Sequence, residues 1–528
     1  MKLDIILRTC QKSQFDKNLK INSPEFERIC GSDREQMIYR CVMSLINTIN
    51  RANFNIQFTV LDDHSDKSFI DNLKILLKRC EKPTELVHLE KLGANNSAYE
   101  QFYRASQCED LVYSVEDDYL HEPDAINYMV HAYIHFKEKY GGDVAIFPFD
   151  CPFRYVNGRE EQTILYYDGI RYWRQVSYTT NTFLTTSAQL RKDFDVYSKL
   201  ALEYPKVLED DTINKLYLNL EKNTGHVRVF SPIPSCAYHL SYQEPTVIAS
   251  PQLSWADLWE SSNYLDLFEG WYNYAPFYES YASQLPHDAK VIEVGSWLGK
   301  STIGMVNTNR RLNKNITVYA VDTWEGSEEP KHYETIDNLK KQNTTPYDEF
   351  ITNIKIYGVS SSIIPIQKTS EEASKDFYAG FADLIIIDAA HDYANVTNDI
   401  KHWISKVKKG GILAGDDYDD KWPEVVAAVK DYFGEGNYSV VGSTWYKVIQ
   451  NNERNGVNMK QTIEARTLEN GLIEPHHEIE VVCAACGYDL DKAELEADTC
   501  SDCNAPLNLK QHISIHATSV PAAGGKVF

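Results

Sequence analysis

Carboxylates end two strand-like segments in the C-terminal half of the sequence. Asp388 follows the apolar run ADLIII, and Asp416 and Asp417 follow GGILAG. Such side chains are hard oxygen ligands that suit Mg²⁺ or Mn²⁺. His391 lies three residues after Asp388, and an imidazole with an ordinary pKa near ~6.5 is a suitable general base. Together these groups would activate a hydroxyl for attack, whereas the plainer interpretation is that His391 and Asp417 cap loops or helices.

A glycine-rich turn, EVGSWLGKST, follows an earlier strand-like segment. Glycine lacks a side chain and tolerates positive φ, so the backbone there can approach a ligand closely. Asp322 ends the next strand-like segment, about one βαβ step later, where a carboxylate can hydrogen-bond a ribose diol. Taken alone, the turn equally suits a plain strand-to-helix connection. The acids at further strand ends favour a ligand site.

Four motifs in this order, EVGSWLGKST, YAVDTW, IIIDAAHDY and GGILAGDDY, resemble class I S-adenosylmethionine-dependent methyltransferases. In particular they resemble the metal-dependent sugar O-methyltransferases of macrolide biosynthesis. The resemblance covers roughly residues 274–448 and implies a Rossmann-like domain. It implies that Asp322 holds the cofactor's ribose and that Thr369 and Ser370 lie near its adenine. It also implies a set of residues that line the methionine end of the cofactor: Glu293, Gly295, Ser296 and Gly299.

Acidic residues also end strand-like segments in the N-terminal half. The triplet Glu116-Asp117-Asp118 follows LVYSV, and Asp62-Asp63 follows an earlier apolar segment. An acid-x-acid triplet at a strand end can hold Mn²⁺ or Mg²⁺ against a diphosphate. A solvated acidic turn is the commoner role for such a triplet. Here the acids are followed downstream by Glu209-Asp210-Asp211 and by His239.

This second series of motifs resembles GT-A glycosyltransferases of the inverting, family-2-like type. The matching segments are IILRT, TVLDDHS, GANNSA, YSVEDDYL, LEDDTIN and CAYHLSY, over roughly residues 1–242. Leu7-Arg8-Thr9 replaces the common proline-containing opening, which leaves the contacts to the nucleotide base open. The resemblance implies a nucleotide-sugar donor contacted by Asp62 or Asp63. It also implies a metal held by Glu116 and Asp118, with His239 as a further ligand or simply a core histidine.

The same resemblance implies a base that deprotonates the acceptor hydroxyl. Asp210 is the first assignment for this base, and Glu209 and Asp211 are the rivals. Aromatic residues between the triplet and this base suit either sugar stacking or core packing. They are Tyr166, Tyr167, Tyr172, Trp173 and Tyr178.

Four cysteines near the C-terminus form two CxxC pairs, with 13 residues between the pairs: Cys483, Cys486, Cys500 and Cys503. This spacing predicts a tetrahedral zinc site made of four thiolates. Because a small segment needs the metal to fold, the expected role of the zinc is structural. The seven other cysteines are scattered from Cys10 to Cys236 and are expected to be reduced thiols.

Strand-like and helix-like segments alternate along both halves, which predicts a multidomain α/β protein with parallel sheets. The polar stretch 451–456 is typical of a linker. We therefore expect a GT-A-like domain over 1–250, a methyltransferase domain over 254–450 and a zinc ribbon with a tail over 459–528. The clearest strand-like segments are 3–7, 54–61, 111–115, 290–294, 317–321, 382–387 and 411–414.

The composition excludes several classes of protein. A formal net charge of −23 over 528 residues argues against nucleic acid or an anionic membrane as a partner of the whole surface. No apolar run is long enough to predict a membrane span. The start, MKLDIILRTCQ, lacks the pattern of a signal peptide, so a cytoplasmic protein is expected.

The leading hypothesis is a bifunctional glycan-modifying enzyme. One site would transfer a sugar from a nucleotide-sugar donor, and the other would methylate a hydroxyl, with S-adenosylmethionine and Mg²⁺ or Mn²⁺ as cofactors. One alternative is a glycan-binding or particle-surface protein with a degenerate transferase domain. Another is a methyltransferase that acts alone on a small hydroxy compound. The sequence leaves open the donor, the acceptor and the oligomeric state.

Overall fold

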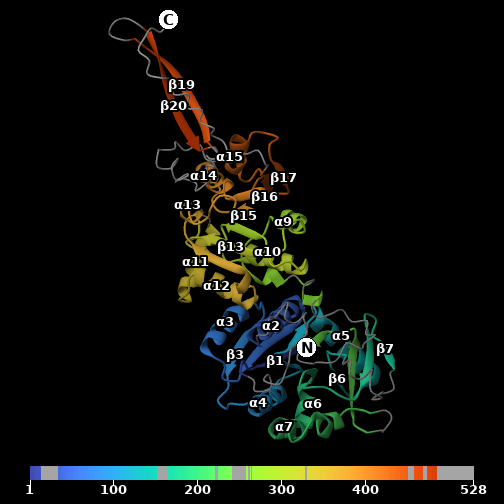
Figure 1. The fold of residues 1–528 in the computed structure, drawn as a ribbon. Coiled ribbons are helices and arrows are strands. Elements are labelled where there is room, and N and C mark those ends of the chain that lie inside the picture. The colour runs from blue at the N-terminus through green and yellow to red at the C-terminus, as the bar shows by residue number, and fades with distance from the viewer. Residues whose placement is uncertain are drawn as a thin grey trace. The chain divides into compact units, whose positions relative to one another are not determined.

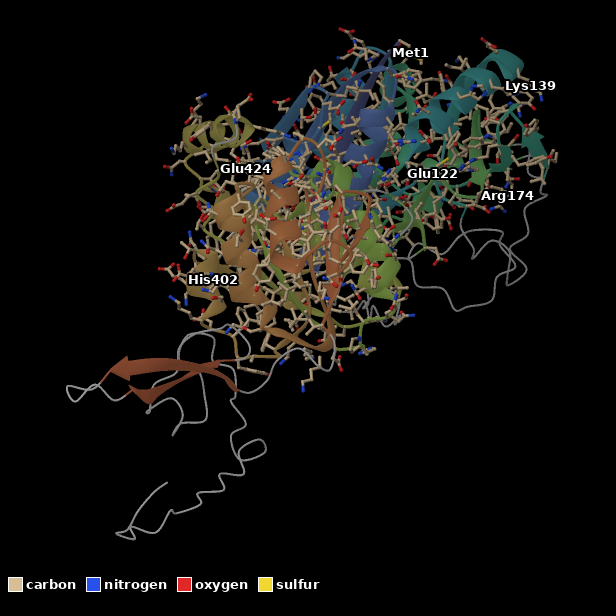
Figure 2. All side chains as sticks on the ribbon, turned by 90° about the horizontal axis from the view of Figure 1, so that it is seen from above. Met1, Glu122, Lys139, Arg174, His402 and Glu424 are labelled. Carbon is tan, nitrogen blue, oxygen red and sulfur yellow. The ribbon has the colours of Figure 1, made fainter. Side chains whose placement is uncertain are left out.

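The computed structural model describes most of the chain, in two compact units. Met1–Glu269 with Glu349–Ser360 form the first unit, and Gly270–Asp348 with Ser361–Phe528 form the second. Figure 1 labels their elements, and Figure 2 shows side chains ending in oxygen or nitrogen all around them. No helix among the described residues is long and apolar enough to span a membrane. The described residues are 1–12, 34–150, 164–219, 224–240, 257–259, 262, 264–327, 330–449, 457–467 and 473–483.

A nine-stranded sheet is the centre of the first unit, in the order β3-β2-β1-β4-β9-β6-β10-β8-β7. The helices α2, α3 and α4 connect its parallel strands from β1 to β4. The strands of the unit are β1 (Lys2–Thr9), β2 (Asn55–Asp62), β3 (Thr84–His88), β4 (Leu111–Glu116), β5 (Tyr119–His121), β6 (Asp143–Ile146), β7 (Leu165–Tyr167), β8 (Tyr172–Val176), β9 (Phe183–Thr186), β10 (Val227–Ile233) and β11 (Ala237–His239). The helices are α2 (Arg34–Arg51), α3 (Lys67–Leu77), α4 (Ala94–Gln107), α5 (Ala125–Tyr140), α6 (Ser187–Lys192) and α7 (Phe194–Glu203), with 3-10 turns η3 (Glu209–Asp211), η4 (Ile213–Lys215) and η5 (Tyr264–Leu267).

This sheet is parallel in one half and mixed in the other. β1 pairs in parallel with β2 and β4, and β2 pairs in parallel with β3. β9 is antiparallel to β4, and β8 is antiparallel to β10 and β7. The prediction of a parallel sheet is therefore confirmed from β3 to β4 and wrong for most pairs beyond, where β6 and β10 still pair in parallel. β7 and β8 are joined by a short loop, which permits an antiparallel pair but leaves no room for a crossover helix.

A buried arginine holds the segment 349–360 within the first unit. The Arg40 guanidinium lies over the ring of Trp259 at 4.1 Å and over that of Tyr357 at 4.6 Å. It also donates to the backbone carbonyl of Tyr357. Because the side chain is almost wholly buried, these contacts replace the water that a charged group would otherwise hold.

The second unit is built on a seven-stranded sheet, in the order β14-β13-β12-β15-β16-β18-β17. The five strands from β14 to β16 are parallel, and β18 and β17 add an antiparallel edge. The strands are β12 (Lys290–Val294), β13 (Thr317–Asp322), β14 (Ile363–Gln367), β15 (Ala382–Ile387), β16 (Val407–Gly415), β17 (Ser439–Val441) and β18 (Thr444–Val448). The helices are α9 (Ala275–Ala282), α10 (Lys300–Arg311), α11 (Pro330–Lys341), α13 (Ser370–Ser374), α14 (Tyr393–Ile404) and α15 (Pro423–Phe433). The helix α12 (Pro346–Ile356) belongs to the first unit from Glu349 on, and the 3-10 turn η6 (Ser360–Ser362) spans the return to the second unit.

The central strand β15 explains why this sheet forms where it does. Its apolar run leaves Leu384, Ile385 and Ile386 fully buried between two layers of helices. α14 packs its apolar face, including Trp403, into the same core. The strand ends therefore carry the polar residues, as the sequence pattern predicted.

A long antiparallel hairpin, β19 (Val457–Thr467) and β20 (Ile473–Cys483), follows the sheet. Its last residue is Cys483, the first of the four cysteines predicted to bind zinc. Cys486, Cys500 and Cys503 lie outside the described residues, as do the side chain of Cys483 and the predicted linker 451–456. The zinc site stays a prediction.

Replacing Arg40 with alanine should destabilise the first unit by about 3 kcal/mol, because a desolvated cation–π stack and a buried hydrogen bond are lost together. The matched control is Arg51→Ala, which removes an exposed ion pair with Asp124 and should cost less than about 1 kcal/mol. Urea unfolding followed by tryptophan fluorescence measures both. Equal midpoints for the two variants would contradict the role assigned to Arg40.

Candidate functional site

A cavity of about 290 Å³ lies at the carboxyl ends of the parallel strands in the second unit. Residues within two positions of the ends of β12, β13, β15 and β16 line it, which is where ligands bind in open α/β sheets. Four of the residues singled out in the sequence do not line it, namely Glu293, Gly299, Thr369 and Asp416. Those that do line it are Gly295, Ser296, Asp322, Ser370, Asp388, His391 and Asp417.

Gly295 brings two strand ends together at the floor of this cavity. Its φ is +94°, and a Cβ on it would lie only 1.9 Å from the carbonyl oxygen of Asp388. The Asp388 N–H in turn donates to the carbonyl of Val294 at 2.7 Å. Only glycine satisfies both the backbone conformation and the close approach.

Glu293, at the end of β12, holds the glycine turn through hydrogen bonds. It is fully buried and accepts hydrogen bonds from four hydroxyls. Burial raises the pKa of its carboxyl, although the hydroxyl donors oppose that rise. Glu293 therefore holds the turn rather than lining the cavity. The donors are Ser296 at 2.7 Å, Ser301 at 2.6 Å, Tyr274 and Thr302.

Asp322 faces the cavity from the end of β13. Its carboxylate accepts from the backbone N–H groups of Trp297 and Trp324, each at 2.7 Å. Both tryptophans have positive φ, +43° and +56°, which aims these N–H groups at the acid. Burial raises the pKa of Asp322 despite these donors. Because a carboxylate has about four lone-pair sites, Asp322 can still accept a hydrogen bond from a hydroxyl of a diol.

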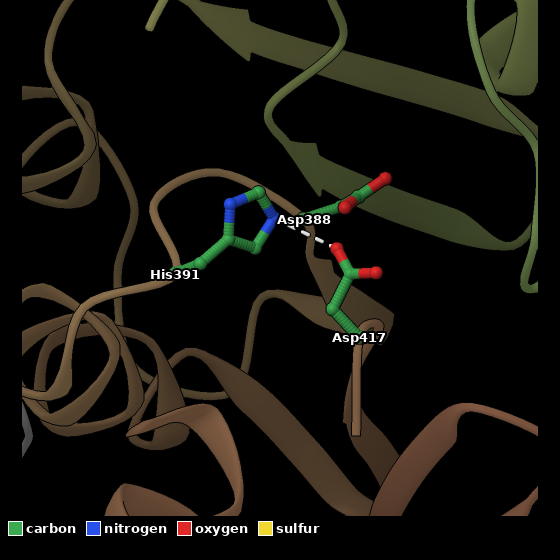
Figure 3. Close-up of side chains that lie close together, drawn as sticks. All are labelled: Asp388, His391 and Asp417. Carbon is green, nitrogen blue, oxygen red and sulfur yellow. Dashed lines mark ion pairs between the residues drawn. The ribbon is translucent and has the colours of Figure 1, made fainter. Parts of the chain in front are cut away.

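Asp388, His391 and Asp417 converge on one wall of the cavity (Figure 3). Each offers a ligand atom within 4.8 Å of those of the other two. His391 Nε2 lies 2.7 Å from Asp417 Oδ2. The His391 ring stacks on Trp422 with centroids 3.9 Å apart, and Asp417 has a φ of +58°. Sites of function often store such backbone strain.

Asp416 does not belong to this group, although it is adjacent to Asp417 in sequence. Its carboxylate accepts from Ser443 Oγ at 2.7 Å and from Thr444 Oγ1 at 3.5 Å. Burial raises its pKa. Asp416 thus ties β16 to the start of β18, and the three-residue group contains two acids and one histidine.

A larger cavity, of about 850 Å³, lies in the first unit beyond the ends of β1, β2 and β4. Asp63 lines it and accepts from the Gly93 N–H at 2.9 Å. Asp62 does not line it, because its carboxylate bonds the Ser65 N–H and His88. Other lining residues are Arg8, Cys10, Glu116, Asp117, Asp118, Glu209 and His239.

The three acids at the end of β4 make different contacts. Asp117 is buried and accepts from Thr9 Oγ1, the Cys10 N–H and Arg34 at about 3 Å, so it holds the end of β1. Glu116 pairs with Arg8 at 2.6 Å. Asp118 lies 3.0 Å from His239 Nε2.

His239 is held in place by two neighbours. Its ring stacks on Tyr119 with centroids 4.6 Å apart, and Asp118 pairs with its Nε2. Burial alone would lower the pKa of His239, but the Asp118 carboxylate outweighs this and the net pKa is raised. His239 and Asp118 therefore form one hydrogen-bonded pair in the cavity wall.

The acids of η3 are not equivalent. Glu209 lines the cavity, and burial, together with the nearby charges of Glu116 and Asp210, raises its pKa. Asp210 is exposed and accepts from Asn214 at 2.8 Å. The geometry therefore favours Glu209 over Asp210 as a base in this cavity.

The aromatic residues of this unit are split between core and surface. Trp173 is buried and donates to Asp168 at 2.8 Å, and Tyr178 is buried too. Tyr166 packs edge-on against Phe230. Tyr167 and Tyr172 are exposed and pair with each other at 5.1 Å.

A known protein family resembles part of the second unit. A family model described as "Methyltransferase domain" matches residues 292–418, the segment that carries the glycine turn, Asp322 and the three-residue group. This segment is a methyltransferase domain. The match confirms the prediction of such a domain, and its family implies S-adenosylmethionine as the cofactor.

The "Uncharacterized protein R132" of Acanthamoeba polyphaga mimivirus is 30% identical over 160 residues. The match covers 29% of this chain and 64% of that protein. Among solved structures, cofactor-bound Rv0187 from MTB is 18% identical, with a TM-score of 0.25 over 35% of this chain and 83% of that one. The O-methyltransferase NovP is 15% identical, with a TM-score of 0.25 over 34% and 80%.

The donors and acceptors of the methyltransferase cavity fit this cofactor. Asp322 retains acceptor capacity for a ribose hydroxyl, and the glycine turn leaves its backbone open to a ligand. Trp297 and Trp422 also line the cavity and were missed in the sequence. The position of Trp297 inside the glycine turn is the sequence signal from which it could have been predicted.

Replacing Gly295 with alanine should destabilise the second unit by at least about 3 kcal/mol, because backbone strain and a steric clash add. Gly410→Ala is the matched control, since Gly410 has a similar φ of +81° but open space around it. It should cost only about 1 kcal/mol. Thermal unfolding measures both, and equal losses would contradict the close approach at Asp388.

Proposed function

We propose that the second unit is an S-adenosylmethionine-dependent O-methyltransferase that uses a divalent cation. The observation that carries this proposal is the convergence of Asp388, His391 and Asp417 beside the cofactor cavity of a methyltransferase domain. Two carboxylates and an imidazole suit Mn²⁺ or Mg²⁺. Asp416 has no part in the proposed set, because its carboxylate is bonded elsewhere.

The chemistry requires an activated acceptor. A neutral hydroxyl is a poor nucleophile, and a divalent cation lowers the pKa of a hydroxyl that binds to it. S-adenosylmethionine supplies the methyl group. The protein's own contribution is to hold the acceptor oxygen in line with that group.

The chain fixes the three ligands from separate elements. Asp388 ends β15, Asp417 follows β16, and His391 lies in the loop before α14. Trp422 supports the His391 ring, so that Nε2 faces the two carboxylates. We assign His391 to the ion rather than to a separate base, since this nitrogen already faces Asp417.

Replacing Asp388 with alanine should abolish Mn²⁺ binding and slow methyl transfer by at least about 100-fold, because one of the three ligands is lost. Binding of S-adenosylhomocysteine should persist. Electron paramagnetic resonance of Mn²⁺, thermal shift and methyl transfer to a panel of saccharide and phenol acceptors measure these effects.

Asp420→Ala is the control, because this acid is exposed and near the site but outside the group. It should behave as the unchanged protein does. Full methyl transfer in the presence of a chelator would contradict the metal and return His391 to the role of a general base.

A second activity, sugar transfer from a nucleotide-sugar donor, is proposed for the first unit. The observation that favours it is a cavity of about 850 Å³ that gathers Asp63, Glu116, Asp118 and His239 at strand ends. Asp118 and Glu116 would hold a divalent cation, with His239 beside them. A cation there would offset the charge of a leaving diphosphate.

Glu209 is proposed as the base that takes the proton of the acceptor hydroxyl. It lines the cavity, and burial raises the pKa of its carboxyl, which makes it a stronger base than an ordinary glutamate. If both units act on one glycan, joining them raises the local concentration of each substrate. The predicted zinc ribbon at Cys483, Cys486, Cys500 and Cys503 would then serve as a separate structural element.

Replacing Glu209 with glutamine should lower sugar transfer by about 100-fold, because the amide cannot accept the proton, while donor affinity changes little. Asp210→Asn is the matched control and should keep most of the activity. The assay uses UDP, GDP, CDP and dTDP sugars with Mn²⁺. The reverse order of the two variants would restore Asp210 as the base, and donor binding without turnover would favour a glycan-binding role.

A further inference from the structure

We infer that Lys421 binds an anionic substituent of the methyl acceptor, so that the methyltransferase prefers acceptors that carry a carboxylate or a phosphate close to the hydroxyl that is methylated. This inference rests on the proposed divalent-cation site and names the substrate class of that site. Lys421 acts here as a specificity residue, because it binds the acceptor and takes no part in the transfer of the methyl group.

A short loop after β16 brings Lys421 to the wall of the cavity. The Asp419 N–H donates to the carbonyl of Asp417 at 3.0 Å, and Asp419 Oδ1 accepts from the Lys421 N–H at 2.8 Å. The Trp422 N–H donates to the Asp419 carbonyl at 3.1 Å, and α15 begins at the next residue. Because Asp419 holds both ends of this loop, Lys421 and Trp422 line the same cavity as Asp417.

The indole of Trp422 joins Lys421 to the proposed ion site. Its ring stacks on His391 with centroids 3.9 Å apart, and Lys421 Nζ lies 4.8 Å from the centroid of the same ring. In the described part of the chain, the Lys421 ammonium has no acid as an ion-pair partner. An ammonium has three N–H donors, so a contact with a ring face leaves it able to bind an oxyanion.

The two other lysines that line the cavity are placed differently. Lys368 pairs with Asp376 at 2.6 Å, so its charge is already balanced. Lys300 is the first residue of α10 and directly follows the glycine turn. Lys421 is therefore the lysine of this lining that follows β16, as Asp417 does, and that has no acid beside its ammonium.

The charge of the loaded cavity also favours an anionic acceptor. Three aspartates and three lysines are among the lining residues, so their formal charges cancel while the histidines are neutral. A divalent cation and the sulfonium of the cofactor would make the cavity positive, and the oxyanion of one activated hydroxyl offsets only part of that charge. A further anionic group on the acceptor makes the charges complementary.

A neutral acceptor would not meet this requirement. It would displace water from the Lys421 ammonium and offer no charged partner in return, which is unfavourable for a charged group. A carboxylate or a phosphate supplies that partner and forms a charge-assisted hydrogen bond. The two anions share this chemistry, so the experiment includes both.

The test compares sugars that differ in charge: glucose with glucuronate and glucose 6-phosphate, and galactose with galacturonate and galactose 6-phosphate. Calorimetric titration into the full chain with S-adenosylhomocysteine and Mn²⁺ measures affinity, and methyl transfer from S-adenosylmethionine measures kcat/KM. In at least one series, an anionic sugar should be favoured over its neutral partner by about tenfold or more. A preference for only the carboxylate or only the phosphate supports the inference and identifies the anion.

Lys421→Met should reduce this preference to about twofold or less, because the positive charge is lost while the length of the side chain is kept. Lys421→Arg keeps the charge and should keep the preference. Lys430→Met is the matched control, since Lys430 is an exposed lysine of α15 outside the cavity. This variant lowers the net charge by the same amount and should behave as the unchanged protein does.

Three results would overturn the inference and leave the proposed function standing. They are equal affinity for neutral and anionic sugars, failure of every anionic sugar to bind, and a preference that survives in Lys421→Met. Failure of S-adenosylhomocysteine or Mn²⁺ to bind the unchanged protein would overturn the proposed function as well.

Discussion

The close approach of Gly295 to the carbonyl of Asp388 is the constraint on which the methyltransferase site depends. It draws the ends of β12 and β15 together, and both strands are locked by their neighbours in the sheet. Glu293 fixes the turn by accepting hydrogen bonds from four hydroxyls, and Asp322 fixes it by accepting one from the Trp297 N–H. The cavity and the group at Asp388 are therefore positioned by the same two strand ends. A change at either strand end would alter both the cavity and the group.

In both units the role of a carboxylate depends on the hydrogen-bond donors around it. An acid that is fully enclosed by hydrogen-bond donors holds the backbone, as Glu293 does. Acids that face a cavity retain acceptor capacity, as Asp322 and Glu209 do. Adjacent residues can thus have opposite roles, and Asp416 and Asp417 are the clearest pair. A carboxylate can bind a ligand only where neighbouring side chains do not already use its oxygens.

The sequence predicted much of the second unit because strand ends there coincide with changes in polarity. The predicted bounds of β12 and β15 agree with the structure, since apolar runs stop where the sheet is no longer covered. The sequence could not separate Asp416 from Asp417, because that choice depends on the left-handed conformation of Asp417 and on Ser443, 27 residues away. Nor could it place residues 349–360 in the first unit, since the stack on Arg40 joins positions far apart in the chain.

The central claim is that Asp388, His391 and Asp417 hold a divalent cation beside the cofactor cavity. Anomalous diffraction from crystals of the full chain, grown with Mn²⁺ and S-adenosylhomocysteine, tests it most directly. The account predicts one Mn²⁺ peak within ligand distance of all three residues and none at Asp416. A cofactor bound in the cavity with no Mn²⁺ peak among the three residues would contradict it.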